Sequence, residues 1–342
     1  MPPATASADL SARRRVLRYA SHHPTPRKTR AKSMSKKTNK KRSKGRVGII
    51  GLGIMGGAFA KNLSEAGWHV AGYDMSAAAC KQARRAGVEI AGSAAELAAM
   101  VPTIITSLPK PKALDATVRA IAKAKLPRRV IVEMSTFTLE DKESAERILQ
   151  KAGHVMLDAP VSGTGAQAKT KDLVFYASGD RRSIAKLRPL FKDFGRASYD
   201  LGAFGNGSRM KYVANLLVAI HNVASAEAMV LGMKSGLDPQ MIYDLISAGV
   251  GTSRIFELRG PKMVKNDYTG VTMKISVWQK DMQVIGDFAK KIGVPTPLLT
   301  ATKPIYEKAL AGEYAEEDTA SVCAVLEAMA GFKRGKARAK PR

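Results

Sequence analysis

The feature that most constrains the fold is a glycine-rich turn between an apolar run and a helical pattern. Val47–Ile50 is typical of a buried strand, and it leads directly into Gly51-Leu52-Gly53-Ile54-Met55-Gly56. A helical pattern of apolar residues then runs from Phe59 to Ala66. In this setting the first glycine permits a tight turn, the second lets a pyrophosphate approach the backbone, and the third lets the helix pack on the strand. The segment predicts a dinucleotide-binding unit.

Asp74 points to the identity of the dinucleotide. It lies 23 residues after Gly51, at the end of the next predicted strand, His69–Tyr73. A carboxylate there can accept a hydrogen bond from a ribose 2′-hydroxyl, and it repels a 2′-phosphate. No arginine stands at position 75 or 76 to bind such a phosphate. We therefore predict a preference for NAD, with NADP as the alternative cofactor.

Strand and helix patterns alternate from residue 46 to residue 205, and only helical patterns follow. The alternation predicts an α/β fold with a Rossmann-type doubly wound parallel sheet over 46–205. The later helices predict an all-helical C-terminal domain over 206–331. Further predicted strands are Thr103–Leu108, Arg129–Met134, His154–Val161, 173–177 and 197–201. The predicted C-terminal helices are 206–235, 239–248, 274–292, 298–311 and 317–330.

Both ends of the chain are strongly basic, and they carry most of the formal net charge of +27. Residues 1–46 contain 15 Lys and Arg and one acid, whereas residues 331–342 contain six Lys and Arg and no acid. We interpret residues 1–45 as a basic, disordered extension and residues 332–342 as a basic tail. Two alternatives for the extension stay open: a transit peptide and an arm that binds phosphate backbones. We do not expect nucleic acid to be a partner, except through these tails.

Composition excludes several other classes of protein. The two cysteines, Cys80 and Cys323, lie far apart, which argues against a disulfide framework or a cysteine zinc site and fits a reducing compartment. The five histidines have no metal-ligand spacing, and no apolar run approaches the ~20 residues of a membrane span. We predict a cytoplasmic protein without a metal, or a protein of the mitochondrial matrix if the extension is a transit peptide.

Four separated segments together resemble the β-hydroxyacid dehydrogenase family, which contains 3-hydroxyisobutyrate dehydrogenase and tartronate semialdehyde reductase. Besides the glycine-rich turn, they are Asp158-Ala159-Pro160-Val161-Ser162-Gly163, Gly205-Asn206-Gly207 with Lys211 and Asn215, and Lys280-Asp281. The match extends from residue 46 to about residue 330. The resemblance implies an NAD(P)-dependent oxidoreductase of small 3-hydroxy acids such as 3-hydroxyisobutyrate, or their semialdehydes. It also implies a C-terminal domain like that of 6-phosphogluconate dehydrogenase, and a homo-oligomer.

The Ser-Gly turn after the predicted strand 154–161 offers backbone N–H groups and a hydroxyl, which suit a carboxylate. The resemblance assigns Ser162, Gly163 and Thr164 to the acid group of the substrate. The family usually has a second glycine where this chain has Thr164.

Lys211 and Asn215 lie four residues apart, on one face of a predicted helix. A lysine near the start of an apolar helix either extends its amine to water or has a chemical role. A buried lysine with a lowered pKa can act as general base or acid in alcohol oxidation and its reversal. The resemblance implies that Lys211 is this catalytic residue and that Asn215 orients the substrate.

Leu108, Pro109 and Thr136 follow two predicted strands, where ligands bind in open parallel sheets. The resemblance implies that they line the cofactor site and that Lys280 contacts the cofactor, although Lys280-Asp281 by itself is typical of a charged surface pair. Two alternative functions stay open. One is a glyoxylate or succinic semialdehyde reductase of the same family, and the other is a non-catalytic protein that senses a dinucleotide and associates with nucleic acid.

Overall fold

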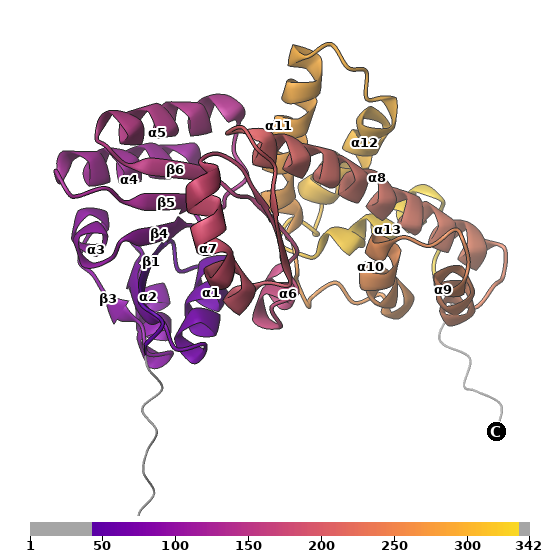
Figure 1. Ribbon diagram of the computed structural model, residues 1–342. Helices are drawn as coiled ribbons and strands as arrows, with labels where there is room; N and C mark the ends of the chain where they lie inside the picture. Colours follow the sequence, from indigo (N-terminus) through magenta and orange to yellow (C-terminus); the bar gives the residue numbers. More distant parts are fainter. Residues whose placement is uncertain (1–42, 335–342) are drawn as a thin grey trace, which may run out of the picture. The chain divides into compact units, whose positions relative to one another are not determined.

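A computed structural model describes residues 43–334 of the protein. Six strands form a parallel sheet in the order β3-β2-β1-β4-β5-β6 (Figure 1). Strand β1 is central, because Ile49 pairs with Gly72 of β2 on one side and with Ile105 of β4 on the other. The predicted doubly wound sheet is confirmed. Its strands are β1 (Arg46–Ile50), β2 (His69–Tyr73), β3 (Glu89–Ile90), β4 (Thr103–Thr106), β5 (Val130–Glu133) and β6 (Val155–Asp158).

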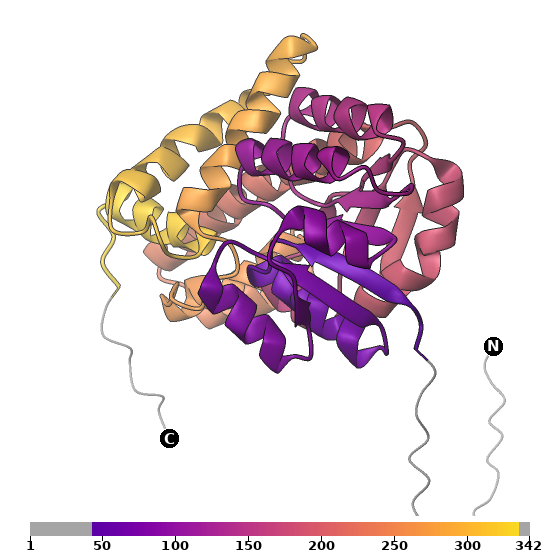
Figure 2. The ribbon, with the colours of Figure 1, turned by 90° about the vertical axis from the view of Figure 1, so that its left-hand side faces the viewer.

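Successive side chains of each strand enter two different hydrophobic cores. Ile49 and Val132 face the core that contains α1, α2 and α7, whereas Ile50 and Ile131 face the core that contains α3, α4 and α5. Figure 2 shows α3, α4 and α5 side by side on their face of the sheet. The helices are α1 (Ile54–Glu65), α2 (Ala77–Arg85), α3 (Ala94–Met100), α4 (Pro111–Lys123), α5 (Leu139–Lys151) and α7 (Arg181–Phe194).

A second, three-stranded sheet follows β6. Its strands are β7 (Val161–Ser162), β8 (Val174–Ala177) and β9 (Ala197–Asp200), and the short helix α6 (Gly165–Lys169) lies between β7 and β8. Strand β8 is antiparallel to β7 and parallel to β9. The prediction of a single strand over 154–161 is therefore wrong. Pro160, which has no N–H to donate, stands at the break between the two sheets.

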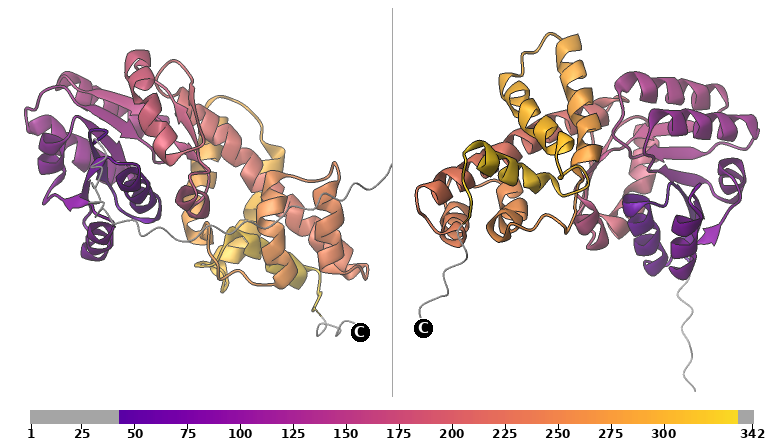
Figure 3. Two further views of the ribbon diagram at one scale, coloured as in Figure 1. Left: turned by 60° about the horizontal axis from the view of Figure 1, so that its bottom comes forward. Right: turned by 180° about the vertical axis from the view of Figure 1, so that it is seen from behind.

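The rest of the described chain is helical, and most of its helices contact α8 (Figure 3). By length and apolar composition α8 could cross a membrane, yet 44% of its most apolar 18-residue window is buried inside the protein. The elements are α8 (Asn206–Lys234), α9 (Pro239–Ala248), α10 (Arg254–Lys265), α11 (Ile275–Lys291), α12 (Pro297–Ala311), the 3₁₀ turn η1 (Thr319–Ser321) and α13 (Val322–Met329).

The first turns of α8 lie against the sheets. The helix contacts β6, β7 and β8, and a Cβ atom on Gly207 would lie only 2.2 Å from the carbonyl oxygen of Tyr176 and 2.7 Å from that of Asp158. From the other direction, Leu139 of α5 belongs to the core of the helical region. This contact places Lys211 and Asn215 next to the carboxyl ends of the parallel strands.

Candidate active site

The glycine-rich turn has the geometry of a pyrophosphate cradle. Gly51 has a φ of +90°, and a Cβ on Gly56 would lie 1.8 Å from the carbonyl oxygen of Gly51, so neither position admits a side chain. At Gly53, by contrast, a Cβ would have no atom within 4 Å. Gly53 is also the N-cap of α1, and no side chain caps the helix. Open space therefore faces the N-terminal N–H groups of α1, which suits an anion.

Asp74 lies at the end of β2, beside this turn, and holds it in place. Its Oδ2 accepts a hydrogen bond from the N–H of Leu52 at 2.6 Å, and its Oδ1 accepts one from the N–H of Ser76 at 2.7 Å. The structure thus brings together Asp74 and the turn that the sequence associates with it. Each carboxylate oxygen has a further lone pair that can accept a ribose hydroxyl.

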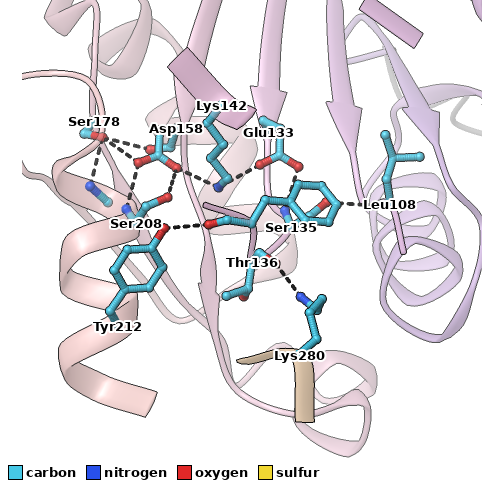
Figure 4. A network of polar contacts seen from close by, with 12 residues as sticks. Leu108, Glu133, Ser135, Thr136, Lys142, Asp158, Ser178, Ser208, Tyr212 and Lys280 are labelled. Atoms are coloured by element: carbon cyan, nitrogen blue, oxygen red, sulfur yellow. Dashed lines mark hydrogen bonds and ion pairs between the residues drawn. The ribbon is translucent and has the colours of Figure 1, made fainter. Parts of the chain in front are cut away.

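The loops after β4 and β5 meet at the carboxyl edge of the sheet. The N–H of Leu108 donates to Oγ of Ser135 at 2.8 Å, and the Lys280 ammonium donates to the carbonyl oxygen of Thr136 (Figure 4). Lys280 Nζ also lies 5.3 Å from the ring centroid of Phe137. Leu108, Thr136 and Lys280, which come from three distant parts of the sequence, are therefore neighbours.

The Ser162–Thr164 segment lies close to the glycine-rich turn. Gly163 has a φ of +135°, and a Cβ on the next glycine, Gly165, would lie 2.4 Å from Cγ2 of Ile54. Thr164 makes its polar contacts within α6. Its N–H donates to Oε1 of Gln167 at 3.0 Å, and its hydroxyl donates to the same oxygen at 3.4 Å. The donors of Thr164 are thus already engaged within α6.

Lys211 and Asn215 share one face of α8, as their spacing predicts. Asn215 is buried, and its Nδ2 donates to Oδ2 of Asp281 at 2.9 Å. Asp281 is also buried, and its Oδ1 lies 2.9 Å from Nζ of Lys280. The interpretation of Lys280-Asp281 as a surface pair is therefore wrong. Asp281 was not predicted as a site residue, because the local sequence does not show which face of this helix is buried.

The Lys211 side chain is half-buried, and among residues 43–334 no carboxylate forms an ion pair with it. Burial is the largest influence and lowers the pKa of Lys211 to about 8. The Asp281 carboxylate raises this pKa, whereas the ammonium groups of Lys280 and Lys142 lower it. A lysine in this state can exchange a proton with a substrate near neutral pH.

Two other features bear on the location of the site. An apolar groove of about 400 Å³ lies between α8, α11 and α12, and its lining includes Val213, Leu216 and Phe288 but none of the predicted site residues. Within the described chain, no group of three or more His, Cys, Asp or Glu side chains is placed to hold a metal ion.

Comparisons with protein families cover the sheet region and the helical region separately. Residues 46–204 match the family described as the NAD binding domain of 6-phosphogluconate dehydrogenase. Residues 205–326 match the family described as "NAD-binding of NADP-dependent 3-hydroxyisobutyrate dehydrogenase".

Individual relatives are similar over most of their length. L-threonate dehydrogenase of Cupriavidus necator is 32% identical over 281 residues, which are 81% of this chain and 94% of that protein. Mitochondrial 3-hydroxyisobutyrate dehydrogenase of Mus musculus is 31% identical, over 82% of this chain and 86% of that protein. Chloroplastic glyoxylate/succinic semialdehyde reductase 2 of Arabidopsis thaliana is 28% identical, over 82% and 79%.

A solved structure gives the same result for the fold. The crystal structure of 3-hydroxyisobutyrate dehydrogenase from Salmonella typhimurium aligns with a TM-score of 0.74 and 29% identity, over 82% of this chain and 99% of that one. The glycine-rich turn, the Asp158–Gly163 segment and the half-buried lysine on α8 stand within the matched ranges. The chain therefore belongs to the β-hydroxyacid dehydrogenase family of NAD(P)-dependent oxidoreductases.

Proposed function

We propose that the protein catalyses reversible hydride transfer between NAD and a small 3-hydroxy acid such as 3-hydroxyisobutyrate, or its semialdehyde, with Lys211 as the general acid and base. The observation that carries the proposal is the state of the Lys211 amine. It is half-buried on the first turns of α8, and its pKa is lowered to about 8. An amine in this state can take a proton from an alcohol and return it to an aldehyde.

The surrounding residues would hold the substrate against this amine. The bound nicotinamide supplies the hydride acceptor for oxidation and the donor for reduction. Ser162 and Gly163 offer a hydroxyl and an N–H to the substrate carboxylate, and Asn215, fixed by Asp281, orients the reacting hydroxyl. Since the donors of Thr164 are engaged by Gln167, Ser162 and Gly163 are the residues that we propose to bind the acid group.

NAD is the proposed cofactor because a carboxylate at the end of β2, here Asp74, suits a ribose 2′-hydroxyl and would repel the 2′-phosphate of NADP. The neighbouring Met75 is almost fully exposed and cannot bind a phosphate. We expect kcat/KM with NADH to exceed that with NADPH by at least about tenfold. Equal values for the two nucleotides would contradict this assignment of Asp74.

The similar proteins suggest three further substrates for the same site. L-threonate follows from the dehydrogenase of Cupriavidus necator, and glyoxylate or succinic semialdehyde follows from the reductase of Arabidopsis thaliana. The alternative of a non-catalytic dinucleotide sensor is less well supported, because such a protein has no need of a desolvated amine at position 211.

The decisive experiment measures NAD(H) turnover with 3-hydroxyisobutyrate, L-threonate, glyoxylate and succinic semialdehyde, for the full chain and for Lys211→Ala. We expect Lys211→Ala to lower kcat by ~10²–10⁴-fold while nucleotide binding remains. The matched control is Lys234→Ala, which removes a lysine from the far end of the same helix. Near-normal turnover of Lys211→Ala would remove the proposed role.

Self-association and a cytoplasmic or mitochondrial location are parts of the same proposal. Exposed apolar side chains on α8, namely Val213, Leu217 and Leu231, are consistent with a second copy packing on this helix. Sedimentation velocity of the full chain tests the first point, and a purely monomeric species at micromolar concentration would contradict it. Imaging of the tagged protein tests the second.

A further inference from the structure

Lys142 is a fully buried lysine that the proposed mechanism does not use. It lies on α5, in the first turn after its N-cap, and its side chain has no exposed surface. Its Nζ is 2.7 Å from Oε2 of Glu133 and 2.8 Å from Oδ1 of Asp158, and both carboxylates are fully buried as well (Figure 4). Burial opposes the positive charge, but the two carboxylates outweigh it and raise the pKa of Lys142.

The Glu133 carboxylate connects Lys142 with the loop after β5, where the predicted cofactor residues lie. Glu133 is the last residue of β5, and its Oε1 accepts a hydrogen bond from the N–H of Ser135 at 2.8 Å. Ser135 in turn accepts the hydrogen bond from Leu108, and it precedes Thr136. Three polar contacts thus connect Lys142 with Leu108, one of the residues that the resemblance assigns to the cofactor site.

The Asp158 carboxylate connects Lys142 with α8, the helix that carries Lys211. Oδ2 of Asp158 accepts from the N–H of Ser208 at 2.7 Å, and Oδ1 accepts from the Ser208 hydroxyl at 2.8 Å. Ser208 is three residues before Lys211, one turn away on the same face of α8. A parallel link joins the same elements, because Tyr212 donates to the carbonyl oxygen of Phe137 at 2.5 Å.

The ammonium group therefore joins two carboxylates that hold two different halves of the site. Without it, two buried negative charges would face each other, and the loop after β5 and the first turn of α8 would lose their common partner. A misplacement of about 1 Å between reacting groups can cost ~10²-fold in rate.

We propose that Lys142 is a positioning residue: by binding Glu133 and Asp158 together, it sets the position of the Lys211 turn of α8 relative to the cofactor loop at Ser135–Thr136. The inference rests on the proposed role of Lys211. According to this proposal, the buried triad of Lys142, Glu133 and Asp158 increases the rate of the reaction in addition to stabilising the fold.

The test compares Lys142→Met with the unaltered full chain, well below the temperature of unfolding. We expect kcat for 3-hydroxyisobutyrate to fall at least about tenfold, whereas the Kd for NADH, measured by fluorescence, changes less than threefold. We also expect the primary isotope effect, measured with deuterium at the hydroxyl-bearing carbon, to increase because hydride transfer becomes slower. An unchanged kcat and isotope effect in the folded variant would overturn the proposal.

A double variant, Lys142→Met with Glu133→Gln, distinguishes a loss of positioning from a loss of stability. It preserves the net charge of the cluster, and the glutamine oxygen can still accept from Ser135, but no cation joins the two sides. We expect its melting temperature to recover while kcat stays low. Recovery of kcat together with the melting temperature would show a purely structural role and would overturn the proposal.

Arg259→Met is the matched control, because it breaks another buried ion pair, 4.0 Å from Asp318 in the helical core. It should lower the melting temperature and leave the isotope effect unchanged; an increased isotope effect in this control would also overturn the proposal. Lys211→Ala, measured in parallel, separates the two hypotheses. Normal turnover of Lys211→Ala contradicts the proposed function. If Lys211→Ala is inactive but Lys142→Met has normal turnover, only the role of Lys142 is contradicted.

Discussion

At Lys211, desolvation and nearby charge act on a single ammonium group. Burial lowers its pKa, Asp281 raises it, and Lys280 and Lys142 lower it, with a result of about 8. The neutral amine, which is the base, predominates above this pH. We therefore predict that kcat for oxidation increases about tenfold per pH unit up to about pH 8 and then levels off. In the reduction direction, which needs the ammonium form, kcat should fall above the same pH, and steady-state rates between pH 6 and 10 check both limbs.

Asp281→Asn should move this pH dependence in a defined direction. Removal of the negative charge removes the influence that raises the pKa of Lys211, so the limb for oxidation should shift to lower pH by roughly one pH unit. The asparagine oxygen can still accept from Asn215, so we expect kcat at its plateau to fall by no more than about tenfold. Asp287→Asn, which neutralises an exposed acid on the same helix, is the control. A shift to higher pH would contradict the assignment.

Residue-scale prediction from sequence succeeded where the geometry is local. The four-residue spacing of Lys211 and Asn215 places them on one face of any helix, whatever surrounds it. Asp281 and Lys142 could not be recognised in the same way, because their burial depends on how α11 and α5 pack against distant elements. A charged residue on a helix face gives no sign of its partners until those partners are in place.

At the scale of elements, α10 illustrates how a helix can be missed. Gly260-Pro261 within it indicates a break, yet the helix continues from Arg254 to Lys265. Pro261 leaves the carbonyl oxygen of Glu257 without its usual donor, and the Tyr243 hydroxyl of α9 donates to that oxygen at 3.2 Å. A Cβ on Gly260 would lie 2.5 Å from the Tyr243 ring, so the glycine leaves space for the tyrosine that replaces the missing N–H donor. A donor supplied by another helix cannot be predicted from the local sequence.

The start of α8 gives a prediction about helix placement. In Gly207→Ala, the new methyl group meets the carbonyl oxygens of Tyr176 and Asp158 at 2.2 and 2.7 Å, and neither backbone atom can move easily. We expect a loss of ~1–3 kcal/mol in the free energy of unfolding and at least about a tenfold fall in kcat, because the turn that carries Lys211 is displaced.

Gly232→Ala in the same helix is the comparison for that prediction. There the methyl group would meet only side-chain atoms of Ile242, which can rotate away. Chemical denaturation and turnover should therefore differ little from those of the unaltered chain. If Gly207→Ala behaved in the same way, the close contact between α8 and the sheets would not govern the site.

At the scale of the whole molecule, the candidate site residues and the first 42 residues occupy separate parts of the sequence. Every predicted site residue lies between residues 51 and 280, and the family matches cover 46–326. The structural prediction for residues 1–42 lies outside the described residues. We predict that deletion of 1–42 leaves kcat and KM within about twofold and reduces retention on immobilised DNA at low salt. Loss of turnover on deletion would contradict this separation.

The overall architecture was predictable because it depends on short-range patterns. The strand–turn–helix around Gly51–Gly56 and the alternation that follows indicate a doubly wound sheet without any knowledge of distant contacts. The division into two sheets at Asp158–Val161 was not predictable in this way. An apolar run indicates a strand but does not show which sheet the strand joins.

Helix α8 is continuous from Asn206 to Lys234, so it is about 43 Å long. Its first turns carry Lys211, and the other C-terminal helices pack along the remainder, so one continuous helix connects the candidate site with the C-terminal bundle. The continuity of α8 determines where two related chains can be joined in a chimaeric protein. A crossover placed after Lys234 keeps Lys211 and Asn215 but replaces their neighbours Lys280 and Asp281, whereas a crossover before Asn206 exchanges all four residues together.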